Sequence, residues 1–247
     1  KNKIKELVRD YVHPETGELI NKDRLDVGGL GKARFILKEG GTLGDLYTQS
    51  DLKRDDNGMV DIDPTGIVAI ENNLPDIKLG SVFPKANLAW SNHFSWKGIS
   101  LSALFTARIG GIVYSATEAA MDQYGVSERS ALARDNGGVL VNNRTLVDAQ
   151  NYYTTIGSES GLPQYYTYNA TNVRLQEASI GYLIPRKWLG NVCDIQVSVI
   201  GRNLWMIYNK APFDPESVAT TDNYYQGIDY FMLPSTRNIG FNVKINF

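Results

Sequence analysis

The chain has 247 residues with a formal net charge of −2, and its only cysteine is Cys193. The balanced charges give no broad electrostatic attraction to nucleic acid, so no nucleic-acid partner is expected. One cysteine excludes an internal disulfide and a cysteine-based metal cluster. No run of about 18 apolar residues occurs, which excludes a transmembrane helix. The mean hydropathy of −0.27 still fits transmembrane strands, because these alternate apolar and polar residues.

The first third of the chain shows two weak strand patterns separated by polar connections. We predict a strand at about residues 1–8 and a kinked strand, interrupted by glycines, at about residues 32–48. The chain opens on Lys1 without a Met or a signal peptide. We therefore expect it to be processed or to be a piece of a longer polypeptide.

Residues 51–79 form an acidic loop in which aspartates recur from Asp55 to Asp63, approximately as in a calcium-binding loop. The EF-hand pattern fails, because Lys53 takes its first ligand position and Pro64 its twelfth. We therefore expect a solvated outer loop and no cofactor, with a bound calcium ion as the alternative.

The clearest pattern is a hairpin with strands at about residues 85–96 and 99–110. Alternate residues are apolar in both, except at Asn92, which indicates one apolar and one polar face. Lys97-Gly98 between them is a two-residue turn that ends in glycine, a strong hairpin signal. Each strand is long enough to cross a bilayer, which takes about 10 tilted residues.

Residues 111–168 show little apolar periodicity, although residues 118–123 suit a short helix. A connection of this length is usually functional in a compact protein. Strands are then predicted at about residues 171–183 and 193–207. In the first of these the apolar parity switches near Gln176, which indicates a β-bulge.

The last strand is predicted at about residues 236–247, where apolar and polar residues alternate strictly up to Phe247. If this strand ends on the inner side of a membrane, the short turns at residues 97–98 and 186–191 lie on that side too. The three long connections, at residues 51–79, 111–168 and 208–234, then lie on the outer side. Short inner turns and long outer loops are the asymmetry of outer-membrane barrels.

Several motifs, in order and spacing, resemble the closing strands of SusC/RagA-type TonB-dependent transporters. They cover residues from about 80 to 247. They are the hairpin residues 94–101 with Gly110-Gly111, residues 172–185, residues 198–205 followed by Phe213-Asp214-Pro215-Glu216, and Leu233-Pro234 before the final strand. The resemblance implies an all-β fold: the last seven or so strands of a large transmembrane antiparallel β-barrel, with long extracellular loops and short periplasmic turns.

The resemblance also implies a function and a location. Residues 1–247 would be the C-terminal portion of a barrel of 22 strands with a plugged lumen, and the plug would lie upstream. Such proteins lie in the outer membrane of Gram-negative bacteria of the Bacteroidota kind. They import oligosaccharides or, less often, peptides, are energised through the TonB complex and act with a SusD-like surface lipoprotein. No enzymatic activity is implied.

Aromatic residues gather in two of the segments assigned to the outside, residues 111–168 and 208–234. Tyrosine rings stack on the apolar faces of sugars, while their hydroxyl groups remain polar, and peptides would use the same rings. We therefore predict ligand contacts at Tyr152, Tyr153, Tyr165, Tyr166, Tyr224, Tyr225 and Tyr230. Interfacial packing or contact with the lipoprotein is the alternative for each of them.

Two further groups are assigned by their strand positions. The aromatic residues expected near the inner ends of the strands would form a membrane belt: Trp90, Phe94, Trp96, Tyr182, Trp188 and Phe247. Inward-facing polar residues are expected to face the lumen or the plug: His93, Arg108, Arg174, Arg202 and Lys244.

Two other classes of protein compete with a transporter. An outer-membrane barrel enzyme would need a catalytic set at the barrel rim, but the two histidines, His13 and His93, are far apart in the sequence. A secreted β-sandwich that binds carbohydrate would be soluble, whereas a transporter requires detergent.

Overall fold

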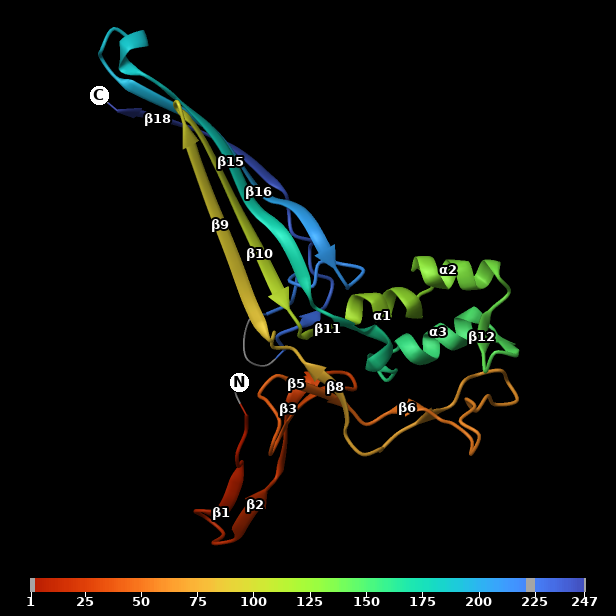
Figure 1. The fold of residues 1–247 in the computed structure, drawn as a ribbon. Helices are drawn as coiled ribbons and strands as arrows, with labels where there is room; N and C mark the ends of the chain where they lie inside the picture. The colour runs from red at the N-terminus through yellow and green to blue at the C-terminus, as the bar shows by residue number, and fades with distance from the viewer. Residues whose placement is uncertain (1–2, 221–224, 247) are drawn as a thin grey trace. The chain divides into compact units, whose positions relative to one another are not determined.

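The structure, a computed structural model, describes residues 3–220 and 225–246. The chain divides into two compact units, and Figure 1 shows the ribbon coloured along the chain. The mixed unit comprises residues 1–83, 112–168 and 218–232. The strand unit comprises residues 84–111, 169–217 and 233–247.

The strand unit is one antiparallel sheet of five long strands in the order β18-β16-β15-β10-β9 (Figure 1). The shortest has 9 residues and the longest 16, whereas about 9–11 tilted residues cross a bilayer. The strands are β9 (Ala86–Trp96), β10 (Ile99–Ile109), β15 (Asn172–Ile184), β16 (Asp194–Asn209) and β18 (Asn238–Asn246). Each overlaps one of the last five strands expected from the alternation of apolar residues.

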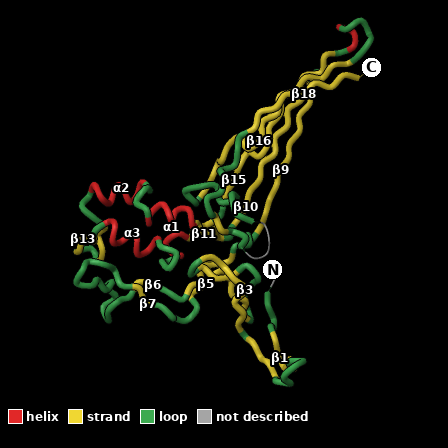
Figure 2. The backbone as a smooth tube through the Cα atoms, turned by 180° about the vertical axis from the view of Figure 1, so that it is seen from behind, coloured by secondary structure: helices red, strands yellow, loops and turns green. Residues whose placement is uncertain are grey.

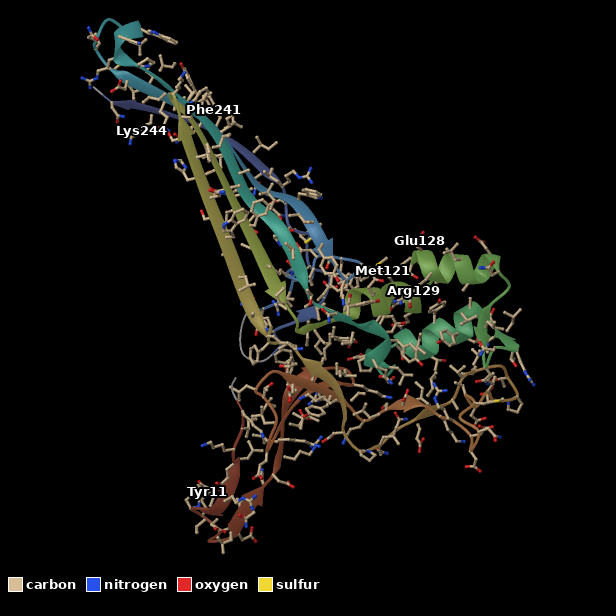
Figure 3. All side chains as sticks on the ribbon, in the orientation of Figure 1. Tyr11, Met121, Glu128, Arg129, Phe241 and Lys244 are labelled. Atoms are coloured by element: carbon tan, nitrogen blue, oxygen red, sulfur yellow. The ribbon has the colours of Figure 1, made fainter. Side chains whose placement is uncertain are left out.

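The register gives this sheet one apolar face. Directly opposed residues of antiparallel strands share a face, and one row runs Phe94–Leu101–Ile180–Val199–Phe241 across all five strands. The row's side chains are exposed, with 68% of Phe94 and 72% of Phe241 accessible. Figure 3 labels Phe241 on β18. The sheet therefore presents a continuous apolar surface rather than a buried core.

The opposite face is polar and carries small side chains. The row next to the turns is Ser95–Ser100–Gly181–Ser198–Asn242. In the following row the hydroxyls of Ser102 and Ser179 lie 2.7 Å apart and hydrogen-bond across β10 and β15. Alternation along each strand thus separates the apolar and polar residues onto two faces.

Both short connections lie at the same end of the sheet. Trp96 pairs with Ile99 across the two-residue turn, whose Lys97 and Gly98 have φ of 47° and 87°, the left-handed pair that a type I′ hairpin requires. Ile99 in turn pairs with Tyr182, near the connection that holds η2 (Arg186–Trp188). The long connections leave from the other end, as the sequence pattern predicts.

The predicted bulge in β15 is confirmed. Leu104 of β10 pairs with Glu177, but the next residue, Phe105, pairs with Leu175, which leaves Gln176 unpaired. The register of β15 against β16 shifts at the same place. The extra residue explains why the apolar parity of the sequence switches there.

The mixed unit contains short strands in several small sheets. A four-stranded sheet has the order β3-β4-β5-β8, and β11 pairs in parallel with β17. The bounds are β1 (Val8–Val12), β2 (Leu19–Lys22), β3 (Arg24–Leu30), β4 (Ala33–Lys38), β5 (Asp45–Thr48), β6 (Asp51–Leu52), β7 (Ile70–Glu71), β8 (Ile77–Ser81), β11 (Ile112–Ser115), β12 (Val139–Val141), β13 (Thr145–Val147) and β17 (Ile228–Asp229). A further strand, β14 (Thr167–Asn169), straddles the boundary of the two units in the sequence.

Helices fill the long connection between β11 and β14. They are α1 (Ala116–Gln123), α2 (Glu128–Asp135), α3 (Ala149–Gly157) and η1 (Pro163–Tyr166), and Figure 2 shows the three α-helices together in red. Ser115, Ser127 and Asp148 cap the α-helices by accepting a backbone N–H with their side chains. The short helix expected at residues 118–123 is therefore present as part of α1.

Two predictions for the first third are corrected. The strand expected at residues 1–8 begins only at Val8, in β1. The kinked strand expected at residues 32–48 is two antiparallel strands, β4 and β5, with 6 and 4 residues. Strands of this length are too short to cross a bilayer. Within the described residues, no helix is long and apolar enough to span a membrane.

The hydrophobic core lies within the mixed unit. Phe35, Leu46 and Tyr166 are fully buried, and α1, α3 and the sheet of β3, β4, β5 and β8 contribute to the same cluster. The mixed unit can therefore bury its apolar side chains in water, whereas the described strand unit forms an open, uncored sheet.

Candidate ligand site

The described tyrosines among the predicted ligand contacts lie in the mixed unit and have different surroundings. Tyr152 and Tyr165 line a pocket of about 430 Å³ together with Arg54, Asn142 and Asn143. Both rings also pack against the hydrophobic core and are partly buried. Burial raises the pKa of both tyrosines, that of Tyr152 to about 12. Both tyrosines therefore stay neutral at physiological pH and offer a ring and a hydroxyl.

Asn142 fixes one wall of this pocket. Its side chain accepts the N–H of Val60 at 2.8 Å and donates to the carbonyl of Val60 at 2.9 Å. A side-chain amide thus replaces the backbone partner that Val60 would have in a sheet. Asn142 has a φ of 57°, a left-handed conformation that asparagine tolerates better than most residues.

Tyr166 is a core residue, so the prediction of a ligand contact is wrong for it. Its side chain is 0% exposed, and its hydroxyl donates to Asp122 at 2.9 Å. Burial and the nearby Asp122 carboxylate raise its pKa. The sequence places Tyr166 beside Tyr165, but η1 turns the two side chains in different directions.

Asp122, near the end of α1, is the centre of a buried polar network. Besides Tyr166, its carboxylate accepts the hydroxyl of Ser127 at 2.5 Å and Nε of Arg129 at 2.8 Å. Figure 3 labels Arg129 on α2 beside α1. The guanidinium carbon lies 4.9 Å from the centre of the Tyr166 ring, a cation–π distance. The network joins α1, α2 and η1.

The other predicted tyrosines are dispersed. Tyr153 meets Tyr152 edge to face at 5.3 Å and lines a pocket of about 300 Å³ with Asp122 and Arg134. Tyr225 is 44% exposed and contacts Phe35 edge to face at 6.5 Å. Tyr224 lies outside the described residues.

Tyr230 lines a third pocket, of about 320 Å³, which we name the aromatic pocket. Its floor is formed by Tyr114 and by the alanine face of α1, and its rim carries Tyr124, Tyr230 and Phe231. The lining residues are Leu30, Gly31, Tyr114, Ala116, Ala119, Ala120, Gln123, Tyr124, Gly157, Ser158, Glu159, Tyr230 and Phe231.

Local hydrogen bonds place the rim of the aromatic pocket against α1. Ser115 donates to Asp229 at 2.6 Å, and the N–H of Phe231 donates to Thr117 Oγ1 at 2.7 Å. The rings of Tyr230 and Phe231 meet edge to face at 5.2 Å. The residues after β17 are thus held across the first turn of α1.

Two glycines allow the walls of the aromatic pocket to approach each other. A Cβ at Gly157 of α3 would lie 2.6 Å from the carbonyl oxygen of Ala119 in α1. A Cβ at Gly31 would lie 2.4 Å from the carbonyl oxygen of Glu159. Any larger residue would force these backbones apart. Sequence reasoning missed Tyr114, Tyr124 and Glu159, because only the fold brings them to Tyr230.

The described residues among those predicted as a membrane belt lie on exposed positions of the strand unit. Phe94 and Trp96 fall near the turn end of β9, as expected, and Tyr182 pairs with Ile99 beside that turn. The prediction that Trp90 lies near the inner end of its strand is corrected, because Trp90 lies in the middle of β9, where its ring stacks on Phe105 with centroids 5.4 Å apart. Trp188 lies in η2 and is 63% exposed. Phe247 lies outside the described residues.

The residues predicted to face the lumen or plug lie on the polar face. His93 pairs with Ser102, Arg108 with Asn172, and Lys244, labelled in Figure 3, with Gln196. The guanidinium of Arg202 bonds to Glu177 at 2.8 Å.

Arg174 has its partners within the strand unit. Its side chain is 4% exposed and lies 2.8 Å from Asp214 and 3.3 Å from Glu216. Burial would raise the pKa of Asp214, but hydrogen bonds from Arg174 and Ser235 lower it. Arg174 therefore fastens the connection after β16 to the sheet.

The acidic loop is built from two similar turns. Asp55 accepts the backbone N–H of Asn57 and Met59, and Asp63 accepts those of Thr65 and Ile67. Asp61 instead pairs with Lys53 at 2.8 Å. Among the described residues, no group of three His, Cys, Asp or Glu side chains is arranged to hold a metal ion.

These observations define the class of the chain. It is a mostly β protein whose long strands have an exposed apolar face and an opposite polar face, the pattern of transporter barrels in the outer membrane. No protein-family model matches the chain. In sequence it is 25% identical over 179 residues to TonB-dependent receptor P3 of Formosa agariphila, an alignment that covers 67% of this chain and 17% of the receptor.

Solved structures show the same fold. The RagAB peptide importer in its closed-closed state matches with a TM-score of 0.61 and 18% identity, over 94% of this chain and 26% of the importer chain. The open-open state of the same importer matches with a TM-score of 0.61 and 16% identity, over 92% of this chain and 24% of the importer chain. The chain thus spans about a quarter or less of the proteins it matches. The resemblance to SusC/RagA-type TonB-dependent transporters is confirmed, and these similar proteins are a receptor and importers rather than enzymes.

Proposed function

We propose that this chain forms a sector of an outer-membrane, TonB-dependent transporter that imports peptides. The observation that carries the proposal is the five-stranded sheet, whose exposed apolar rows suit lipid and whose polar face suits a lumen. The fold shared with the RagAB peptide importer supports the substrate class. Import of oligosaccharides is the second candidate, because Tyr152 and Tyr165 line a pocket beside the amides of Asn142 and Asn143.

The sheet edges support a larger barrel. β9 and β18 are the outer strands of the described sheet, so each has one edge without a partner there. An open edge in lipid leaves backbone N–H and C=O groups unsatisfied. In the proposed transporter, strands from the rest of a longer polypeptide pair with both edges and close the barrel around a plug.

The proposed mechanism is binding followed by gated passage, without covalent chemistry. The mixed unit would supply ligand contacts on the extracellular side, where the long connections lead. A SusD-like lipoprotein would act with it there, and the TonB complex would supply energy through the plug. The fold shared with the RagAB peptide importer supports binding and passage of a peptide.

Uptake in the source bacterium tests the proposal. A strain lacking the whole gene would be complemented with the full-length protein and supplied with fluorescent oligopeptides or with labelled oligosaccharides. We expect complementation to restore accumulation of the peptides, and a protonophore to abolish it because TonB energy depends on the proton gradient. Restored accumulation of oligosaccharides alone would replace the peptide proposal by the second candidate. Accumulation of neither, with a correctly assembled barrel, would overturn nutrient import.

A further inference from the structure

We propose that the aromatic pocket binds a cationic group of a peptide, either its terminal ammonium or a Lys or Arg side chain. This inference rests on the proposed import of peptides and names a chemical preference within it. The pocket lies entirely in the mixed unit and is built from β11, α1, α3 and the residues that follow β17.

The charge of the pocket favours a cation. Glu159 is the one Asp, Glu, Lys or Arg among its described lining residues. No Lys or Arg of residues 3–220 or 225–246 forms a salt bridge with Glu159. Its carboxylate therefore stays available to a ligand. Burial, and then the charge of Glu159, raise the pKa of Tyr114 to about 12, so Tyr114 stays neutral at the pocket floor.

The rim offers a second attraction for a cation. The side chains of Tyr124, Tyr230 and Phe231 are 76%, 54% and 59% exposed within this chain, so three large exposed rings surround one pocket. Aromatic faces attract ammonium and guanidinium groups, and several rings together form the cages that bind such cations. Gln123 and Ser158 add polar groups to the same lining.

The backbone holds one ring of the rim in a strained conformation. Phe231 has a φ of 51°, a left-handed conformation that is rare for a bulky residue. The hydrogen bond from its N–H to Thr117 and the pairing of β17 with β11 maintain it. Strain that the surroundings maintain is typical of ligand sites. The Phe231 ring is 59% exposed at this pocket.

The size of the pocket limits the occupant. About 320 Å³ lies at the lower end of ligand-pocket volumes. Such a space accommodates one amino-acid side chain or a terminal residue rather than a whole peptide. The site would therefore select among peptides, and other contacts would hold the rest of the ligand.

Peptide binding to the full-length protein in detergent micelles would test the site. The probes are the fluorescent pentapeptide Ala-Ala-Lys-Ala-Ala with a free amino terminus, the same peptide N-acetylated, and the acetylated peptide with Gln in place of Lys. Anisotropy would give the affinity of each. Glu159→Gln removes the charge at constant shape, and the exposed Glu128→Gln, labelled in Figure 3 on α2 and outside the pocket, is the matched control.

We expect Glu159→Gln to weaken the free and Lys-containing peptides about fivefold, the order of an exposed ion pair, and to leave the acetylated Gln peptide unchanged. Tyr230→Leu should weaken the cationic peptides two- to fivefold. Glu128→Gln should change none. If Glu159→Gln weakens binding of the peptide with a free amino terminus but not of the acetylated Lys peptide, the pocket binds the terminal ammonium. If Glu159→Gln also weakens binding of the acetylated Lys peptide, the pocket binds the Lys side chain.

Two results would overturn the inference in different ways. If the wild-type protein binds the cationic and neutral peptides and Glu159→Gln affects them equally or not at all, the cation site is wrong and peptide import stands. If the wild-type protein binds none of the peptides, both the cation site and the peptide substrate class are wrong. A heat-dependent shift in gel migration, unchanged between variants, verifies that each barrel is assembled.

Discussion

The two units of the chain bury opposite kinds of side chain. The mixed unit encloses a hydrophobic cluster in which Phe35 and Leu46 are 0% exposed. In the described strand unit the buried apolar side chains are only Ala170, Ala211 and Pro215, although its sheet carries many large apolar residues on its surface. One unit follows the rule for water-soluble folds, and the other inverts it.

The difference shows that the two units need different surroundings. Burial of apolar area away from water stabilises the mixed unit. The strand unit gains little in this way, because its apolar rows stay on the outside. Its backbone is satisfied by strand pairing, and its apolar face requires an apolar medium, which the bilayer of the proposed transporter provides.

Buried polar groups also differ between the units. In the mixed unit Asp122 joins two helices and a turn from the centre of a cored region. In the strand unit Arg174 and Asp214 join a sheet to the connection that follows it, and Asn172, 1% exposed, lies beside them. A buried charge is tolerated in both because it is paired and hydrogen-bonded.

The largest expected effect comes from breaking the Asp122 network, which should destabilise the mixed unit but not the strand unit. Asp122→Ala would leave the Tyr166 hydroxyl buried without its acceptor and Arg129 without its main partner. Loss of one member of a buried pair costs about 3–5 kcal/mol. We expect hydrogen exchange in α1 and α2 of the full-length protein to accelerate accordingly, while amides of β15 and β16 keep their protection. Equal acceleration in both units would show that they unfold as one.

The next effect tests the two faces of the sheet with neighbouring residues of β15. Ile180→Arg places a charge on the apolar face, which costs about 2–4 kcal/mol near the middle of a bilayer. Ser179→Arg places the same charge on the polar face and should be tolerated. The measurement is the yield of heat-modifiable barrel in the outer membrane. Similar yields from both variants would contradict the assignment of the apolar face to lipid.

The alternation of residues was sufficient to predict the strand unit. Apolar and polar residues alternate along its long strands. The Lys97-Gly98 turn and the bulge at Gln176 can also be recognised from the local sequence. Nothing comparable marks the mixed unit. Its strands have 2 to 7 residues, too few for periodicity to be read, and tertiary contacts decide where each begins. The strands expected at residues 1–8 and 32–48 were wrong for this reason.

The site was less predictable than the sheet. Tyr230 was predicted as a ligand contact, and it lines the aromatic pocket together with the adjacent Phe231. Their neighbours could not be predicted, because Tyr114, Tyr124 and Glu159 come from segments about 70 to 115 residues away and carry no local motif. The prediction of a ligand contact at Tyr166 was wrong, because adjacency in the sequence does not reveal which of two neighbouring rings η1 turns into the core.

The smallest effect concerns Asp76, which joins facing residues of β3 and β4 in the mixed unit. Its carboxylate, 3% exposed, accepts Nε and Nη2 of Arg24 at 2.9 and 3.0 Å and lies 2.5 Å from Lys38. The hydrogen bond from Arg24 is the main cause that lowers its pKa from 3.8 to about 2. Because the carboxyl pKa is lower in the folded than in the unfolded chain, the charged carboxylate stabilises the fold at any pH above the unfolded pKa, near 4. This stabilisation disappears as the pH falls toward the folded pKa, about 2.

Asp76→Asn should therefore destabilise β3 and β4 by about 2 kcal/mol at pH 7 and by progressively less between pH 4 and pH 2. Hydrogen exchange of these strands, corrected for the intrinsic effect of pH, is the measurement. Asp26→Asn is the control, since Asp26 pairs with Arg34 at 3.1 Å where both are about one-third exposed, and such a pair contributes about 0–1 kcal/mol. The strand unit, which does not contain Asp76, should show no such pH dependence. A pH-independent effect of Asp76→Asn would mean that shape rather than charge holds Arg24 and Lys38 in place.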